Sequence, residues 1–224
     1  MDTYVLITAG GHGRRLNAAF PKQFIPVSGR TLLMRTIDVF HDFDPKMKIV
    51  LVIPEEYIPL WKDLCTEFDF QTEHQIVRGG SERFHSVQNG LHHIPSDSIV
   101  LIHDGVRPMV RPDTIERVIE TTLKNGNAVP CVVPSQTVRE IDGDNSKLLD
   151  RRKLRLIQTP QGFRSNLIKE AYNQEFQKIF TDDASVLESL GHKINLVDGN
   201  YSNIKVTHPA DIKMVEALLK IEFD

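Results

Sequence analysis

Apolar residues follow two different spacings along the chain, and the two spacings alternate. Nearly continuous apolar runs predict strands buried on both faces, at 4–8, 48–53, 74–77, 98–103 and 194–197. Apolar residues three or four positions apart predict helices between these strands, at 31–40, 58–68, 84–91, 112–125 and from about 209. Pro112 and Gly126 bound the fourth of these helices. Thr181, followed by Asp182 and Asp183, has the pattern of the N-cap of one more helix. This alternation predicts an α/β domain with a mostly parallel, twisted sheet and helices on both faces.

The segment from 137 to 149 departs from this alternation. Residues 137–141 and 147–149 have the pattern of two short strands, and the polar residues 142–146 between them have that of a turn. The pattern predicts a β-hairpin arm, at about 134–154, that projects from a single domain covering residues 1–224. Projecting strands are prone to pair with another chain, so we expect a homodimer. The alternative is an ordinary hairpin at the edge of the sheet.

The composition suits one globular domain in a reducing compartment. Of 224 residues, 40% are apolar and 25% are charged, which is enough to bury a full core. The net charge of −3 disfavours nucleic-acid and membrane partners, and no apolar stretch approaches the roughly 20 residues of a membrane span. Cys65 and Cys131 form no close-spaced motif, and the nine histidines show no zinc spacing. Since the start of the chain lacks signal-peptide features, we expect a cytoplasmic protein.

The first candidate site is a glycine-rich loop that follows the first predicted strand. Residues 9–15 read Ala-Gly-Gly-His-Gly-Arg-Arg, and Lys22 follows shortly afterwards. Backbone N–H groups in such a loop cradle phosphates, and nearby cations stabilise the charge that builds when a triphosphate breaks at its α-phosphorus. The loop is not a Walker A motif, and Leu16 stands where a dinucleotide fingerprint has its third glycine. The alternative is a tight turn followed by solvated basic residues.

The second candidate site follows the strand predicted at 74–77. Residues 78–86 carry paired glycines and then serine and arginine at the start of a helix. Backbone groups of Gly80 and Ser81 can contact a base, and the Ser86 hydroxyl can bind a ribose or a phosphate. A capped helix after a loop explains the same residues.

The third candidate site follows the strand predicted at 98–103. The sequence there is His-Asp-Gly-Val-Arg-Pro, from 103 to 108, and ligands of open α/β sheets bind at such strand ends. Asp104 can meet a Mg²⁺ shell or a ribose, and Arg107 can meet phosphate. The alternative is an internal Asp104–Arg107 pair that fixes the loop, and both interpretations can hold together.

Basic residues later in the chain predict a contact to a second phosphate. Arg151 and Arg152 lie at the base of the predicted hairpin, and Lys205 lies just before the last predicted helix. Lys205 and an arginine from the hairpin can clamp an acceptor phosphate, because guanidinium groups suit bidentate phosphate contacts. By spacing alone, these residues are surface charges.

Taken together, these motifs resemble the 2-C-methyl-D-erythritol 4-phosphate cytidylyltransferases of the non-mevalonate isoprenoid pathway. The resemblance covers essentially the whole chain. Seven short motifs occur in the order that the family has, at 9–15, 21–24, 79–87, 103–108, 158–161, 181–185 and 203–207.

The resemblance implies a Rossmann-like nucleotidyltransferase domain, whose arm swaps across a homodimer, and a Mg²⁺-dependent reaction of CTP with a polyol phosphate. The acceptor phosphate would attack the α-phosphorus in line, and pyrophosphate would leave without a covalent enzyme intermediate. Arg15 and Lys22 would stabilise the transition-state charge. The acceptor would be positioned by Arg107, Thr137, Thr159, Thr181, Lys205 and, from the partner's arm, Arg151. CTP would be held by Ala9, Gly10, Gly11, Gly13, Arg14, Gly80, Ser81, Arg83, Ser86 and Asp104. Asp104 would contact the metal directly, contact it through a water molecule, or contact only the ribose.

The chain departs from the family pattern at three positions, which brings in a sister family. Gly10 stands where a second alanine is usual, Ser81 where an acidic residue is frequent, and Val106 where alanine is common. Because residue 81 is a serine, the contact to the base would come from the backbone. Gly10, Val106 and the segment Tyr201-Ser202-Asn203 also resemble ribitol-5-phosphate cytidylyltransferases, which make CDP-ribitol. The motif at 181–185 and the compact length favour methylerythritol phosphate as the acceptor.

Two alternatives belong to other functional classes. A non-catalytic nucleotide-binding regulatory protein has no need of the cations Arg15 and Lys22, which are both present beside the loop. A glycosyltransferase needs an Asp-x-Asp motif after a buried strand, and neither 42–44 nor 142–144 follows one. We therefore predict a cytidylyltransferase that makes 4-diphosphocytidyl-2-C-methyl-D-erythritol and pyrophosphate.

Overall fold

The centre of the molecule is an eight-stranded mixed sheet with the strand order β10-β7-β11-β6-β1-β4-β5, in which β12 also pairs with β7. The computed structural model describes residues 1–10 and 21–222. Four adjacent parallel strands form one half of the sheet: β6 (Ile99–Asp104), β1 (Thr3–Thr8), β4 (Lys48–Ile53) and β5 (Gln75–Arg78). The predictions for these four strands are confirmed to within about one residue.

The other half of the sheet consists of β7 (Asn127–Val132), β10 (Leu156–Ile157), β11 (Gln161–Arg164) and β12 (Leu196–Asp198). Of these strands, the sequence pattern revealed only β12. β11 runs antiparallel between β6 and β7, whereas β12 runs parallel to β7. The predicted strand at 194–197 is thus shifted, because the Asn195 N–H is bound by the side chain of Asn127 and the ladder starts at Leu196.

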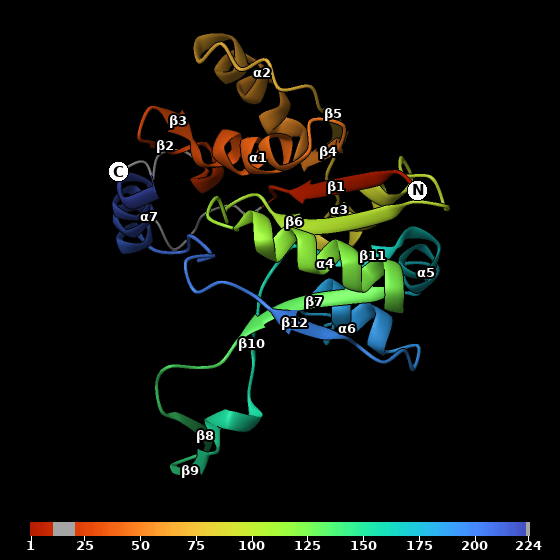
Figure 1. Ribbon diagram of the computed structural model, residues 1–224, viewed down its shortest axis with the longest axis vertical. Helices are drawn as coiled ribbons and strands as arrows, with labels where there is room; N and C mark the ends of the chain where they lie inside the picture. Colours follow the sequence, from red (N-terminus) through yellow and green to blue (C-terminus); the bar gives the residue numbers. More distant parts are fainter. Residues whose placement is uncertain (11–20, 223–224) are drawn as a thin grey trace.

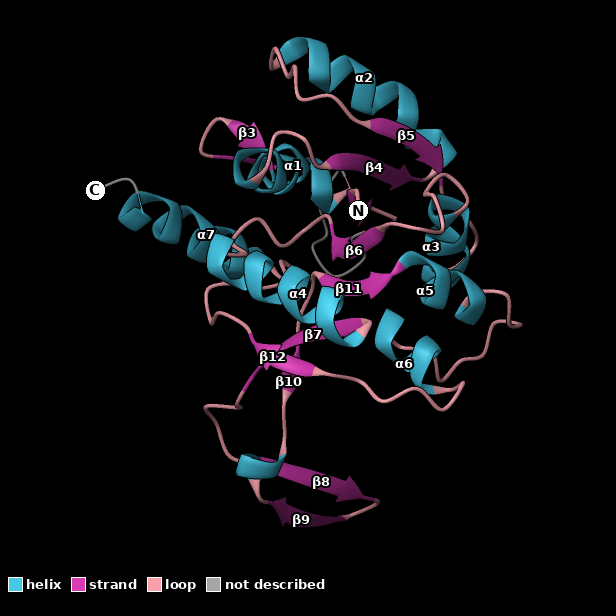
Figure 2. Cartoon of the chain, turned by 45° about the vertical axis from the view of Figure 1, so that its right-hand side comes forward, coloured by secondary structure: helices cyan, strands magenta, loops and turns pink. Residues whose placement is uncertain are grey.

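Helices cover both faces of the sheet, as predicted (Figures 1 and 2). On one face, α1 (Leu32–Phe43), α2 (Ile58–Glu67) and α4 (Pro112–Asn125) form a core with Val5 and Ile7 of β1. On the other face, α3 (Arg83–Leu91), α5 (Ser165–Ala171) and α6 (Asp183–Glu188) form a second core with Tyr4 and Leu6. Successive side chains of a strand point to opposite faces, so β1 contributes to both cores.

The last helix, α7 (Pro209–Glu222), packs beside two short strands, β2 (Pro26–Val27) and β3 (Arg30–Thr31). Val215 and Leu219 of α7 form a separate small cluster with Val27 and Val206. Through this cluster, the segment before α7 packs against the residues that follow the 3₁₀ turn η1 (Lys22–Phe24). A second 3₁₀ turn, η2 (Glu55–Tyr57), lies next to η1.

The helix ends follow local capping chemistry. α4 begins at Pro112 and ends at Gly126, whose positive φ of 89° suits glycine, as predicted. The predicted N-cap of α6 is wrong by one residue, because Asp182 and not Thr181 caps it. The Asp182 carboxylate accepts from the Ser185 N–H at 2.9 Å, and the Ser185 hydroxyl accepts from the Asp182 N–H at 3.2 Å. This reciprocal pair fixes the start of the helix.

The predicted arm is present and projects from the body of the molecule (Figure 1). It consists of β8 (Val138–Asp142), β9 (Asn145–Leu149) and a following 3₁₀ turn, η3 (Arg151–Lys153). Its turn is shorter than the predicted 142–146, because Gly143 adopts a positive φ of 56° that lets the strands pair up to Asp142 and Asn145.

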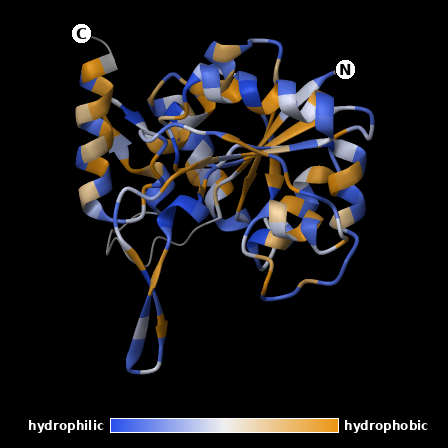
Figure 3. Ribbon diagram, turned by 60° about the horizontal axis from the view of Figure 1, so that its bottom comes forward, coloured by the Kyte–Doolittle hydropathy of each residue, from blue (hydrophilic) through white to orange (hydrophobic). Residues whose placement is uncertain are grey.

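The hydropathy of the chain matches this layering. Figure 3 shows the central strands coloured mostly as hydrophobic and the surrounding helices as mixed. Among the helices of the described residues, none has the length and apolarity that crossing a membrane requires.

Candidate active site

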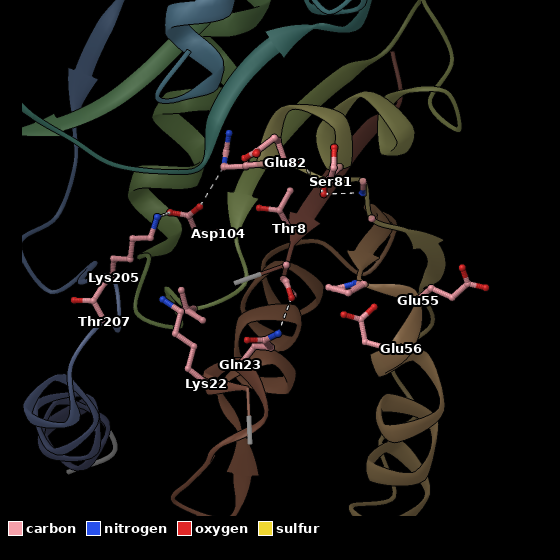
Figure 4. A pocket seen from close by; sticks show the side chains of 18 residues that line it. Thr8, Lys22, Gln23, Glu55, Glu56, Ser81, Glu82, Asp104, Lys205 and Thr207 are labelled. Atoms are coloured by element: carbon pink, nitrogen blue, oxygen red, sulfur yellow. Dashed lines mark hydrogen bonds and ion pairs between the residues drawn. The ribbon is translucent and has the colours of Figure 1, made fainter. Parts of the chain in front are cut away.

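A cavity of about 640 Å³ opens where the parallel strands β1, β4, β5 and β6 end. The register pairs Thr8 at the end of β1 with Asp104 at the end of β6, which brings the first and third predicted sites together. The cavity is lined by Thr8, Ala9, Gly10, Lys22, Gln23, Pro54, Glu55, Glu56, Gly79, Gly80, Ser81, Glu82, Arg83, Ser86, Asp104, Val106, Lys205 and Thr207. Figure 4 shows Lys22 and Lys205 on one side of it and Glu55 and Glu56 on the other.

The carboxylate of Asp104 is the electrostatic centre of the cavity. It lies 3.0 Å from the Lys205 ammonium, 3.2 Å from Nε of Arg107 and 3.7 Å from Nε of Arg83. Burial alone raises the pKa of Asp104, but the three cations lower it well below its usual range. Asp104 is therefore ionised and compensated, and the Asp104–Arg107 pair considered from the sequence is confirmed.

Arg83 bridges two carboxylates. Besides Asp104, it contacts Asp183 of α6 through two parallel hydrogen bonds of 2.8 and 2.6 Å, and the Tyr172 hydroxyl donates to the same carboxylate at 2.6 Å. Burial disfavours the charged guanidinium, yet Asp183 and Asp104 hold the pKa of Arg83 well above its usual range. The bidentate geometry fixes the guanidinium plane, so Arg83 faces the cavity as an ordered cation.

Lys22 and Gln23 are held by backbone carbonyls. The Lys22 ammonium donates to the Val206 carbonyl at 2.9 Å, and the Gln23 amide donates to the Ala9 carbonyl at 2.7 Å. These bonds join η1 to the end of β1 and to the segment before α7. Lys22 and Lys205 are thus brought to one side of the cavity from positions 183 residues apart in the chain.

The loop after β5 is stabilised by its own helix. The Ser86 hydroxyl accepts from the Gly80 N–H at 3.0 Å and donates to the Glu82 carbonyl at 3.1 Å. A Cβ atom at Gly80 would lie 2.4 Å from Cβ of His85, so this close approach requires glycine. Gly80, Ser81 and Ser86, which the sequence predicted as nucleotide contacts, all line the cavity.

Thr159 lies behind Asp104 and not in the cavity lining. It is buried, its hydroxyl accepts from the Asp104 N–H at 3.1 Å, and the same oxygen lies 3.1 Å from Nδ1 of His103. Burial lowers the pKa of His103 to about 4. An acceptor contact through the Thr159 hydroxyl remains a prediction, and it competes with these two bonds.

The remaining predicted residues lie elsewhere. Thr181 is exposed just before α6, while Thr137 and Arg151 lie exposed on the arm, which projects away from the chain's own body in Figure 1. The Arg151 guanidinium donates to the Ser135 carbonyl at the base of the arm. The predicted residues that fall outside the described part of the chain are Gly11, Gly13, Arg14 and Arg15.

Several residues of the site were missed from the sequence. Gln23 and Thr207 line the cavity beside predicted lysines, and Glu55 and Glu56 line it from the end of β4. Asp183 holds Arg83 from 100 residues away, a pairing that no local spacing reveals. The signal that pointed to some of them was membership of the motifs at 21–24, 181–185 and 203–207.

The donors of the site fit a Mg²⁺ ion bound with substrate. Mg²⁺ takes oxygen ligands and is commonly held by one or two carboxylates together with substrate phosphates. Asp104 supplies one such carboxylate in the cavity. Within residues 1–10 and 21–222 there is no group of three or more His, Cys, Asp and Glu residues that could hold a metal ion without a substrate.

The comparison with protein families agrees with this geometry. A model of the 2-C-methyl-D-erythritol 4-phosphate cytidylyltransferases matches residues 3–221. The chain belongs to this family. The cytidylyltransferase of Bacteroides fragilis is 46% identical over 214 residues, covering 96% of this chain and 98% of the relative. That of Bacillus velezensis is 40% identical over 226 residues, covering 99% and 97%.

Solved structures of the family share the fold. The 4-diphosphocytidyl-2C-methyl-D-erythritol synthase of Anaerococcus prevotii has a TM-score of 0.82 at 31% identity, covering 98% of this chain and 96% of that chain. The cytidylyltransferase of Thermus thermophilus has a TM-score of 0.80 at 31% identity, covering 98% and 100%. The predicted Rossmann-like nucleotidyltransferase fold is therefore confirmed, and the family favours methylerythritol phosphate over ribitol phosphate.

Proposed function

We propose that this chain transfers the cytidylyl group of CTP to 2-C-methyl-D-erythritol 4-phosphate, releasing pyrophosphate, in the synthesis of isoprenoid precursors. The observation that carries the proposal is the cavity at the ends of the parallel strands. There, the Asp104 carboxylate contacts Lys205, Arg107 and Arg83, and Lys22 lies on the same side of the cavity as Lys205. Membership of the cytidylyltransferase family supplies the identity of both substrates.

The chemistry requires positioning and charge stabilisation. In-line attack of the acceptor phosphate on the α-phosphorus builds negative charge on the phosphoryl oxygens, which fixed cations stabilise. Lys22, together with Arg15, meets this charge. Lys205 and Arg107 meet the acceptor phosphate, which carries its own nucleophilic oxygen. No general base is needed, because that oxygen is already ionised at neutral pH.

The nucleotide occupies the cavity between the two glycine-containing loops. Ala9 and Gly10 approach it from β1, while Gly80 and Ser81 approach it from β5. Mg²⁺, held by Asp104 and triphosphate oxygens, would neutralise phosphate charge. Arg83, which is itself held by Asp183, contacts one oxygen of the Asp104 carboxylate, and Lys205 contacts the other.

The active form is a homodimer in which the arm of one subunit completes the site of the other. Two observations support this arrangement. The arm that carries Arg151 and Thr137 projects from the body of the chain (Figure 1), and neither residue lines the cavity. The arm also exposes Ile141 by 70% and Leu148 by 59%. Exposed apolar side chains on a projecting hairpin favour burial against another chain. The partner's Arg151 would then reach the acceptor phosphate.

The compartment that we propose is the cytoplasm. Cys65 and Cys131 are free thiols, and burial raises the pKa of the Cys65 thiol to about 11. Unreactive, unpaired cysteines are typical of reducing compartments.

The reaction is tested by following phosphorus directly. In ³¹P NMR, the proposal predicts that CTP, Mg²⁺ and methylerythritol 4-phosphate give the two coupled signals of a pyrophosphate diester and one equivalent of pyrophosphate. Omitting the acceptor gives no pyrophosphate. Formation of free CMP in place of the diester would contradict the proposal, because it would show hydrolysis and not transfer.

A further inference from the structure

His103 is a fully buried polar side chain next to the site, and the reaction gives it no role. It precedes Asp104 in β6, and the ring of Phe40 packs edge-on against it at 4.9 Å. Its Nε2 lies 3.0 Å from the carbonyl oxygen of Arg107, and its Nδ1 lies 3.1 Å from the hydroxyl oxygen of Thr159. The imidazole therefore contacts Arg107, at the last position of the 104–107 turn, and Thr159, which lies between β10 and β11.

The partners of the ring fix the position of its proton. A carbonyl oxygen only accepts, so Nε2 carries the hydrogen and donates to Arg107. Nδ1 then has a free lone pair, which accepts from the Thr159 hydroxyl. The Thr159 oxygen in turn accepts from the Asp104 N–H at 3.1 Å. The result is an ordered series of hydrogen bonds from the Asp104 amide, through Thr159 and His103, to the Arg107 carbonyl.

This series holds both ends of the turn that carries the Asp104 carboxylate. Once the turn is set, Nε of Arg107 lies 3.2 Å from the Asp104 carboxylate, and the same guanidinium donates to the Asn203 carbonyl at 2.8 Å. The Val106 carbonyl accepts from the Val206 N–H at 3.0 Å. Residues on either side of Lys205 are thus docked on the turn, and the lysine is delivered to Asp104.

We propose that His103 is a positioning residue for cytidylyl transfer, which holds the 104–107 turn in the conformation that sets Asp104 and Lys205. This inference rests on the proposed function and deepens it. A histidine that only fills the core affects stability alone. A positioning histidine affects turnover because it places Asp104 and Lys205, although it does not itself contact the substrate. Misplacement of such groups by about 1 Å costs on the order of 100-fold in rate.

The test compares three variants in steady-state kinetics with CTP and methylerythritol 4-phosphate. His103→Phe keeps the ring packing on Phe40 and removes both hydrogen bonds, and Thr159→Val removes the hydroxyl at nearly constant shape. Phe40→Leu is the matched control, because it changes the packing of the same imidazole without removing a hydrogen bond. We expect kcat to fall at least about tenfold in the first two variants with the KM for CTP within about threefold, whereas Phe40→Leu lowers the melting temperature and leaves kcat within about threefold.

A double variant separates action through His103 from a direct acceptor contact by Thr159. If both residues act through one series of hydrogen bonds, His103→Phe combined with Thr159→Val loses no more kcat than the worse single variant. Losses that multiply overturn the proposal, as does a folded His103→Phe protein with kcat within about threefold of the unsubstituted chain. Thr159→Ser, which keeps the hydroxyl, is expected to retain at least about tenfold more activity than Thr159→Val.

A readout that does not need activity keeps this proposal distinct from the proposed function. Amide hydrogen exchange, resolved by NMR, is expected to speed up at least about tenfold at Asp104 in His103→Phe. The Gly79 amide, which donates to the Ile53 carbonyl at 2.8 Å outside this turn, is the internal control and is expected to stay protected. Unchanged exchange at Asp104 overturns the positioning role, whereas an inactive unsubstituted protein overturns the proposed function.

Discussion

The end of β6 and the hairpin arm both carry groups that the proposed reaction needs, but the chain holds them differently. At the end of β6, the Asp104 carboxylate is about one-tenth exposed and has three cations within 3.7 Å. On the arm, the Arg152 side chain is 86% exposed, and Ile141 and Leu148 face solvent. The first region is electrostatically complete within one chain, whereas the second presents charges and apolar groups that the same chain does not cover.

The difference shows which parts of the site a single chain can order. The end of β6 places Asp104 at the carboxyl edge of the parallel strands. Lys205 and Lys22 reach it because the segment before α7 binds both the turn after β6 and the Lys22 ammonium. Nothing in the sheet brings Arg151 there, so the role proposed for Arg151 requires a second subunit.

The largest effect is expected at the cavity. Lys22 lines the cavity and is proposed to face the phosphates, so Lys22→Ala is expected to cost about 3 kcal/mol in the barrier and to lower kcat by roughly 100-fold or more. The fold is expected to persist, as judged by circular dichroism and the melting temperature. Lys213→Ala, which removes an exposed lysine of α7, is the matched control and is expected to keep full activity. Near-normal turnover by Lys22→Ala would remove this residue from the mechanism.

The second prediction concerns the arm and uses mixed subunits. Arg151→Ala and Lys205→Ala are each expected to lose most activity. If the arm acts on the partner's site, half of the dimers in an equal mixture are mixed and have one intact site, so about a quarter of normal activity returns. If Arg151 serves its own chain, mixing restores nothing. If Arg151 does not act in catalysis, Arg151→Ala alone keeps its activity. Activity is measured after unfolding and refolding the subunits together.

The third prediction tests the loop after β5. Gly80→Ala places a methyl group against His85, where a Cβ would approach to 2.4 Å, and is expected to destabilise the fold by about 1–3 kcal/mol. It is also expected to raise the KM for CTP. Gly79→Ala is the control, since its Cβ would lie no closer than 3.3 Å to any neighbour. Equal melting temperatures and equal KM values for the two variants would show that the close approach has no role.

The smallest effect is expected at Trp61, far from the arm. His74 accepts from the Trp61 indole N–H at 2.9 Å, and burial lowers the pKa of His74. Since the unfolded chain then binds the proton more readily, the free energy of unfolding is expected to fall as the pH drops below about 6.5, by less than about 1 kcal/mol. Urea titrations followed by the fluorescence of this single tryptophan measure it. His74→Gln should flatten the dependence between about pH 7 and about pH 5, and an unchanged slope would assign it to other groups.

The sequence predicted those parts of the fold that local pattern controls. Continuous apolar runs located β1, β4, β5 and β6, and Pro112 and Gly126 bounded α4. β10 and β11 were missed because they are only two and four residues long and contain little apolar pattern of their own. Their pairing with β6 and β7 is a tertiary outcome, which propensity does not reveal.

The candidate site shows the same limit. Gly80, Ser86, Asp104 and Lys205 were found because they sit in motifs at strand or helix ends. The Arg83–Asp183 pair and the His103–Thr159 contact join residues 100 and 56 positions apart, and neither spacing matches a local sequence motif. The start of α6 was predicted one residue early for a different reason. Thr181 and Asp182 both suit an N-cap, and only the hydrogen bonds with Ser185 decide between them.

The most direct test of the account is pyrophosphate release with CTP and Mg²⁺, measured with methylerythritol 4-phosphate and with ribitol 5-phosphate as acceptors. The account predicts that kcat/KM for methylerythritol 4-phosphate exceeds that for ribitol 5-phosphate by at least about 100-fold. Both acceptors offer the same phosphate, so the ratio reports the polyol alone. A preference for ribitol 5-phosphate, or pyrophosphate release with neither acceptor, would contradict the proposed function.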